Sequence, residues 1–227
     1  MKKKMVLLIA ALFMISGLAA GEAKASLYDL TYLINGVQPE GSSWLTADFQ
    51  TVATGTVTLT LSSNFSTNPA DPTYPYYFQE VAFNVDPTIV PSSLSISRSA
   101  SSGVIGTVTI ANTTQDAQGM VGSGTLGGGF DVLLSFPTAG GQQDNGRFGL
   151  DNSITFTITG TGITAASFDF LNTANAAHVG AHLAGIPGGL SGAVGDVNLN
   201  PVPIPAAVWL LGSGLLGLVA IRRRFKK

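Results

Sequence analysis

Apolar and polar residues alternate with a period of two along several short stretches of this chain. Residues 56–61, 81–85 and 153–159 alternate strictly, with Val, Ile, Leu or Phe at every second position. Because successive side chains of a strand point to opposite faces, this period is typical of strands that are half buried in an antiparallel sheet. Further strand-like runs cover residues 27–34, 94–97, 104–110, 130–136 and 166–171.

Stretches rich in Gly, Pro, Asn and Asp separate these runs, at residues 64–76, 112–119 and 138–146. These residue types favour turns, because Gly tolerates positive φ, Pro fixes φ, and Asn and Asp bond their own backbone. Short strands separated by turns predict an all-β fold. We expect an antiparallel, jelly-roll-like β-sandwich that spans residues 26–196 as one domain.

The first 25 residues have the organisation of a secretory signal peptide. Three lysines at positions 2–4 precede an apolar stretch at residues 5–20. Ala23 and Ala25 then form an A-x-A site, which predicts cleavage before Ser26. We therefore expect the chain to be exported through the general secretion machinery.

The C-terminal end has three parts: a Pro-rich hinge (197–205), an uncharged apolar segment (206–221) and a basic tail (222–227). As a helix, the apolar segment would span only about 24 Å, against about 30 Å of hydrocarbon in a bilayer. This is a marginal transmembrane helix. The basic tail is expected to stop transfer and stay in the cytoplasm, through Arg222, Arg223 and Arg224.

From position 202 the chain reads VPIPAAVWLLGSGLLGLVAIRRRFKK. This ending resembles the PEP-CTERM family of C-terminal sorting signals, in the variant V-P-x-P-A-A-x-W-L-x-G-S-G-L-x-G-L followed by Arg. The matching residues are Val202, Pro203, Pro205, Ala206, Ala207, Trp209, Leu210, Gly212, Ser213, Gly214, Leu215, Gly217 and Leu218. The commoner form of the motif has Glu at the position of Ile204, which leaves the exosortase subtype open.

The resemblance implies recognition by an exosortase, a membrane-embedded cysteine transpeptidase of Gram-negative bacteria. The precursor would be anchored in the inner membrane facing the periplasm. Cleavage near the Pro motif would then pass the ectodomain to the cell surface or to the exopolysaccharide matrix of a biofilm. An ordinary single-pass anchor is the alternative interpretation of the same segment.

The targeting segments conceal the charge of the part between them. The whole chain has a formal net charge of −2, but residues 26–200 hold only two arginines against twelve acidic residues, which gives about −10. Such a negative field makes nucleic acid an unsuitable partner. Calcium and neutral polysaccharide are better candidate contacts. The chain has no Cys, so the exported domain depends on its core and not on disulfides.

The interior resembles a recurring ectodomain type of PEP-CTERM proteins, to which no biochemical activity is attached. The resemblance supports one continuous domain and transfers no catalytic residue. The residues that carry it lie at positions 44–49, 55–60, 82–87, 130–137, 147–148, 177–179 and 191–192.

Metal ligands are the first candidate chemistry. His178 and His182 are the only histidines and stand four residues apart, a spacing that places two imidazoles on one face of a helix. The alternative is a loop or edge that only hydrogen-bonds them. Asp144 and Asp151, near Asn145 and Asn152, lie on a Gly-rich stretch whose oxygen atoms suit calcium, although the EF-hand spacing is absent. A solvated loop is the alternative there, and no other cofactor is predicted.

The remaining motifs do not predict an enzyme. Residues 122–127 match G-x-G-x-x-G, but they lead into a strand-like run and not a helix, so they do not indicate a dinucleotide site. Trp44 and the aromatic run at residues 74–78 could stack on sugars, or they could pack in the core. We predict a non-enzymatic surface or matrix protein. A carbohydrate- or calcium-binding adhesion module and a secreted glycoside hydrolase are the alternatives.

Overall fold

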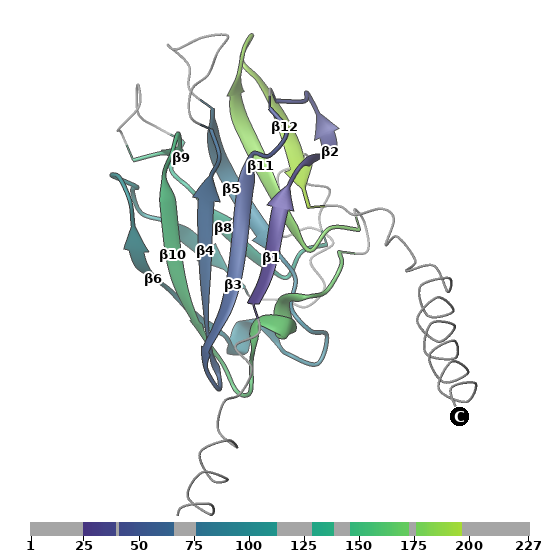
Figure 1. Ribbon diagram of the computed structural model, residues 1–227, viewed down its shortest axis with the longest axis vertical. Coiled ribbons are helices and arrows are strands. Elements are labelled where there is room, and N and C mark those ends of the chain that lie inside the picture. The colour runs from purple at the N-terminus through teal and green to yellow at the C-terminus, as the bar shows by residue number, and fades with distance from the viewer. Residues whose placement is uncertain are drawn as a thin grey trace, which may run out of the picture. The chain divides into compact units, whose positions relative to one another are not determined.

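The computed structural model describes residues 25–39, 41–65, 76–112, 129–138, 146–172 and 176–196 (Figure 1). Within these residues the chain forms two antiparallel sheets packed against each other. The predicted all-β sandwich is therefore confirmed.

The five-stranded sheet has the strand order β1-β3-β4-β10-β6 and faces the viewer in Figure 1. Its strands are β1 (Ala25–Leu30), β3 (Leu45–Ala53), β4 (Thr56–Ser63), β10 (Ser153–Thr159) and β6 (Ser95–Ser101).

The seven-stranded sheet lies behind it, with the order β2-β12-β11-β5-β8-β7 and a short strand β9 that pairs with β5. Its strands are β2 (Tyr32–Gly36), β12 (Leu190–Gly195), β11 (Val179–Ile186), β5 (Tyr77–Phe83), β8 (Val132–Ser135), β7 (Thr109–Ala111) and β9 (Phe148–Gly149). Two short 3-10 helices are η1 (Pro91–Ser93) and η2 (Ala165–Phe168).

The core consists of the alternate apolar residues that the sequence pattern singles out. In β4 and β10, Leu59 and Phe156 are paired across the strands, and both are fully buried. Aromatic rings fill the space between the sheets, and the rings of Phe49 and Phe168 stack at 4.6 Å. The intervening Thr and Ser residues point outward, and Thr60 and Thr155 share a hydroxyl hydrogen bond of 3.1 Å on the outer face.

The single strand-like run at residues 27–34 is in fact two strands. The chain breaks at Thr31, whose N–H donates to Gly195 O, and β1 and β2 belong to different sheets. The chain thus crosses from one layer of the sandwich to the other between β1 and β2, and it passes the end of β12 at Thr31.

The predicted strand at residues 166–171 is wrong. This stretch begins within η2, where the Thr164 N–H donates to Ser167 Oγ at 3.1 Å and closes the first turn. Phe168 packs into the core from this turn, so the apolar residues of this stretch do not reflect the alternation of a strand.

Strands β11 and β12 are not predicted by alternation. Seven of the eight residues of β11 are buried, so the strand lacks the polar half of the pattern. Gly180, Ala184 and the buried His182 occupy the places in β11 that would otherwise be polar and exposed. In β12, a Cβ atom at Gly192 would collide with the carbonyl oxygen of Val37, so this close approach of strands requires glycine.

By its internal contacts the chain divides into two units, Met1–Val197 and Asn198–Lys227. In the described part of the chain, no helix is long and apolar enough to cross a membrane. The predicted transmembrane helix at residues 206–221 lies outside that part, as do the hinge and the basic tail.

Candidate functional site

Several residues predicted from sequence lie outside the described residues: Ala23, Asp144, Val202, Pro203, Ile204, Pro205, Ala206, Arg222, Arg223 and Arg224. Of the predicted signal-cleavage site, Ala25 and Ser26 are described, and both belong to β1. Cleavage before Ser26 would leave the rest of β1 in place and stays a prediction.

The two histidines do not form a pair. They lie on the extended backbone of β11 and of the residue before it, where four residues span about 13 Å, and not on a helix. His182 is buried, while His178 keeps 22% of its side-chain surface exposed. Among the described residues, no group of three or more His, Cys, Asp and Glu side chains could hold a metal ion.

Asp151, the described half of the predicted calcium loop, is an exposed turn residue. Its backbone has a positive φ of 50°, and its N–H donates to Phe65 O at 2.9 Å. This turn connects β9 to β10. Asp144 lies outside the described residues, so calcium binding at this loop stays a prediction.

The predicted sugar-stacking aromatics that the structure describes are mostly core residues, while Tyr74 lies outside the described residues. Trp44, Tyr76 and Phe78 are almost completely buried. Tyr77 is partly exposed, and the Arg147 guanidinium lies 4.2 Å from the centre of its ring. These rings therefore do not form an open stacking surface.

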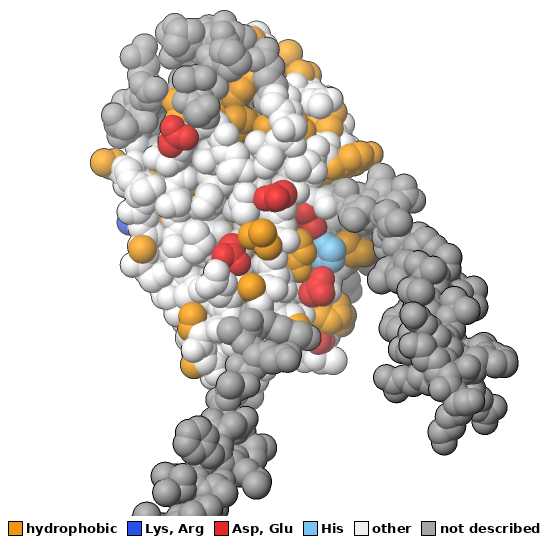
Figure 2. Space-filling view, viewed as in Figure 1, with side chains coloured by type: hydrophobic (Ala, Val, Ile, Leu, Met, Phe, Trp, Pro, Cys, Tyr) orange, Lys and Arg blue, Asp and Glu red, His pale blue; other side chains and the backbone are white. Residues whose placement is uncertain are grey.

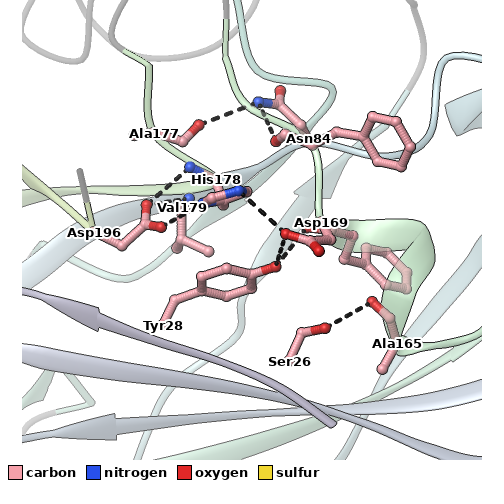
Figure 3. A network of polar contacts seen from close by, with 11 residues as sticks. Ser26, Tyr28, Asn84, Ala165, Asp169, Ala177, His178, Val179 and Asp196 are labelled. Atoms are coloured by element: carbon pink, nitrogen blue, oxygen red, sulfur yellow. Dashed lines mark hydrogen bonds and ion pairs between the residues drawn. The ribbon is translucent and has the colours of Figure 1, made fainter. Parts of the chain in front are cut away.

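The structure instead brings together Tyr28, Asp169, His178 and Asp196, which we call the His178 cluster (Figure 3). Tyr28 comes from β1, Asp169 directly follows η2, His178 directly precedes β11, and Asp196 directly follows β12. Three strands from the two sheets and the helix η2 therefore meet at one point.

Asp196 is the centre of this cluster. Its side chain is only 5% exposed, and its carboxylate accepts three hydrogen bonds. Oδ1 accepts from the backbone N–H groups of His178 (2.8 Å) and Val179 (2.9 Å), and Oδ2 accepts from His178 Nδ1 (2.7 Å). The carboxylate thus binds the start of β11 much as an N-cap residue binds the start of a helix.

His178 connects Asp196 to the rest of the cluster. Its Nε2 lies 3.2 Å from Asp169 Oδ1, and its ring stacks on Tyr28 at a centroid distance of 4.7 Å. The Tyr28 hydroxyl lies 3.2 Å from the same Asp169 oxygen and 3.3 Å from Phe168 O. The cluster therefore joins the first strand of the domain to its last two.

The electrostatics agree with this geometry. The hydrogen bond to Asp196 raises the pKa of His178 above its ordinary value, against the effect of burial, and the negative charges of Asp196 and Asp169 raise it further. Burial raises the pKa of Tyr28 strongly, with a smaller contribution from Asp169, so the phenol stays neutral. The contacts with Asp196 and Asp169 therefore shift His178 toward its protonated form.

The contacts of this cluster hold neighbouring parts of the fold together. Both ring nitrogens of His178 face carboxylates, so neither is positioned to take a proton from a nucleophile. The nearby hydroxyl of Ser26 donates to Ala165 O at 3.4 Å. No sequence motif points to the cluster, because its members are spread over positions 28 to 196.

Replacing Tyr28 with Phe tests the outer part of the cluster. We expect the free energy of unfolding to fall by about 1 kcal/mol, because the hydroxyl contacts are lost while the ring stack remains. Urea unfolding of this variant measures the loss. The matched control is Tyr32→Phe, on an exposed tyrosine of β2. Equal effects of the two substitutions would show that the Tyr28 hydroxyl does not contribute to the free energy of unfolding.

Comparison with known proteins identifies no relative: no family model matches the chain, and neither the curated proteins nor the solved structures give a significant match.

Proposed function

We propose that this chain is an exported cell-surface or extracellular-matrix protein, non-enzymatic, whose jelly-roll-like ectodomain is released from a membrane-anchored precursor by an exosortase. The precursor carries the signal peptide at residues 1–25 and the PEP-CTERM-like sorting signal that begins at Val202. Once released, the domain contributes to the exopolysaccharide matrix of a biofilm.

One observation supports this proposal above the others. The last strand of the sandwich ends at Gly195, and Asp196 directly after it is fastened to β11 by three hydrogen bonds. The contacts that close the described domain therefore come before the Pro-rich hinge at residues 197–205. A cut within the hinge would leave the His178 cluster and both sheets whole.

The intact mass of the released protein tests the proposal. We expect a species that begins at Ser26 and ends within or shortly after the hinge, without the apolar segment and the basic tail. Recovery only as a chain that ends at Lys227 would contradict processing. As a control, replacing both Pro203 and Pro205 with Ala should keep the full-length precursor in the membrane fraction, because the recognised motif is lost while the apolar segment is unchanged.

A further inference from the structure

Within the described residues, the two sheets have four edge strands: β1, β6, β2 and β7. The edge strand β1 lies against η2, through Ser26 to Ala165 and through Tyr28 to Phe168. In the seven-stranded sheet, the edge strand β2 has five residues and β7 has three. The remaining edge strand, β6, has seven residues and is the longest of the four, and among the described residues it pairs with β10 alone.

Strand β6 is open to solvent along its length. Six of its seven side chains are exposed, and only Ile96 is half-buried. In Figure 1 the strand forms one side of the five-stranded sheet, with no other labelled element beyond it. An edge of this kind offers unpaired backbone N–H and C=O groups to another strand.

The sequence of β6 has few of the features that protect edges from pairing. Its residues, SISRSAS, include no Lys, Asp, Glu or Pro. The one charged side chain, Arg98, is bound within the domain, because its Nη1 donates to Ile105 O (2.8 Å) and Gly106 O (3.0 Å). A bulge at Ser99 interrupts the register with β10. The regular stretch available for pairing is therefore residues 95–98.

The charge distribution determines which partner fits this edge. Residues 26–200 carry about −10, so two copies of the domain repel each other on most of their surfaces. Residues 87–115, which include β6 and β7, contain no acidic residue. On the face shown in Figure 2, most acidic side chains lie over β1 and β3 and beyond β1, while the surface over β4 and β10 is largely uncharged. A second copy can approach β6 with the least repulsion.

We propose that β6 pairs with β6 of a second copy of this chain, antiparallel and about a two-fold axis, so that the two five-stranded sheets become one continuous sheet. Residues directly opposite in such a pair point to the same face, so the axis passes through a residue position. Centring it on Ser97 places Ile96 opposite Arg98 of the second copy and avoids opposing two arginines. This inference goes beyond the proposed function. The proposed pairing involves only residues that precede Asp196.

The absence of native cysteine makes the test direct. Ser97→Cys in the full-length chain introduces a single thiol that lies opposite its own copy in the proposed pair. A disulfide forms only when the two Cα atoms are within about 7 Å. After mild oxidation, we expect Ser97→Cys to give a disulfide-linked dimer at least about tenfold faster than the control, because pairing holds the thiols within this distance. The control is Thr159→Cys, an exposed position on β10, which is paired on both sides.

Equal rates at the two positions, or no dimer at either, would overturn the proposal. A second pair of variants tests the contact without cysteine: Ser97→Lys and Ser97→Glu should each lower the measured mass of the detergent-solubilised chain to that of a single copy, and mixing them should restore the paired mass. A mass that neither substitution changes would also contradict the pairing. Both readouts use chains that retain residues 197–227, so a failure of C-terminal processing would not affect them.

Discussion

Replacing Asp196 with Ala is expected to lower the free energy of unfolding by about 3 kcal/mol. The substitution removes a buried carboxylate that accepts two backbone N–H groups and one imidazole N–H. It leaves the N–H groups of His178 and Val179 without this acceptor and leaves His178 with Asp169 alone. Urea unfolding of the exported domain, followed by fluorescence or circular dichroism, measures the change.

Two further variants separate the causes of this loss. Asp196→Asn keeps the shape and one acceptor oxygen but removes the charge, so we expect an intermediate loss of stability. Asp29→Ala removes an exposed carboxylate whose described side-chain contact is with Thr46 Oγ1, and surface changes of this kind are usually within about 0.5 kcal/mol. If Asp196→Ala cost no more than Asp29→Ala, the cluster would not fasten the end of the domain.

The stability of the His178 cluster bears directly on the proposed release of the domain. A domain released by a cut in the hinge must hold its own C-terminal strand without the segment that was removed. Asp196 does this from the last described position, because it is bonded to the strand beside β12 and, through His178, to β1 in the other sheet. Within the described residues, the C-terminal strand is therefore bonded to its neighbour at the position directly before the hinge.

The fold class could be predicted because β4 and β10 bury one face and expose the other, which appears in the sequence as strict alternation. The same rule fails at β11 and β12, where small residues and the buried His182 occupy the positions that are polar and exposed elsewhere. It also fails at residues 166–171, where apolar residues enter the core from a short 3-10 helix.

The His178 cluster could not be predicted for a different reason. Its four members come from opposite ends of the domain and are brought together only by the packing of the two sheets, which places β1 near β11 and β12, and by the pairing of β11 with β12. The spacing of His178 and His182 suggested a shared site on one helix. A strand instead gives the two side chains separate surroundings, and this separation has a measurable consequence.

The two histidines are expected to change stability with pH in opposite directions. Hydrogen bonding to Asp196 raises the pKa of His178 from 6.5, so its contribution is complete below pH 6.5 and is lost as pH rises through the folded-state value. Burial lowers the pKa of His182 from 6.5, so its contribution is complete above pH 6.5 and is lost as pH falls through the folded-state value. We expect the urea midpoint to be highest near pH 6.5.

Single substitutions show which histidine causes each decline of stability with pH. His178→Gln should remove the decline above pH 6.5 and leave the decline below it. His182→Leu should do the reverse. It should also raise stability by about 1 kcal/mol above pH 6.5, and by more below it, because among the described residues neither buried ring nitrogen of His182 has a hydrogen-bond partner. Carboxylates titrate mostly below about pH 5, so this window isolates the histidines.

A pH profile of the His178→Gln variant that keeps both declines would show that the Asp196 bond does not depend on the charge of the ring. Asp196 would then hold β11 through its backbone bonds alone.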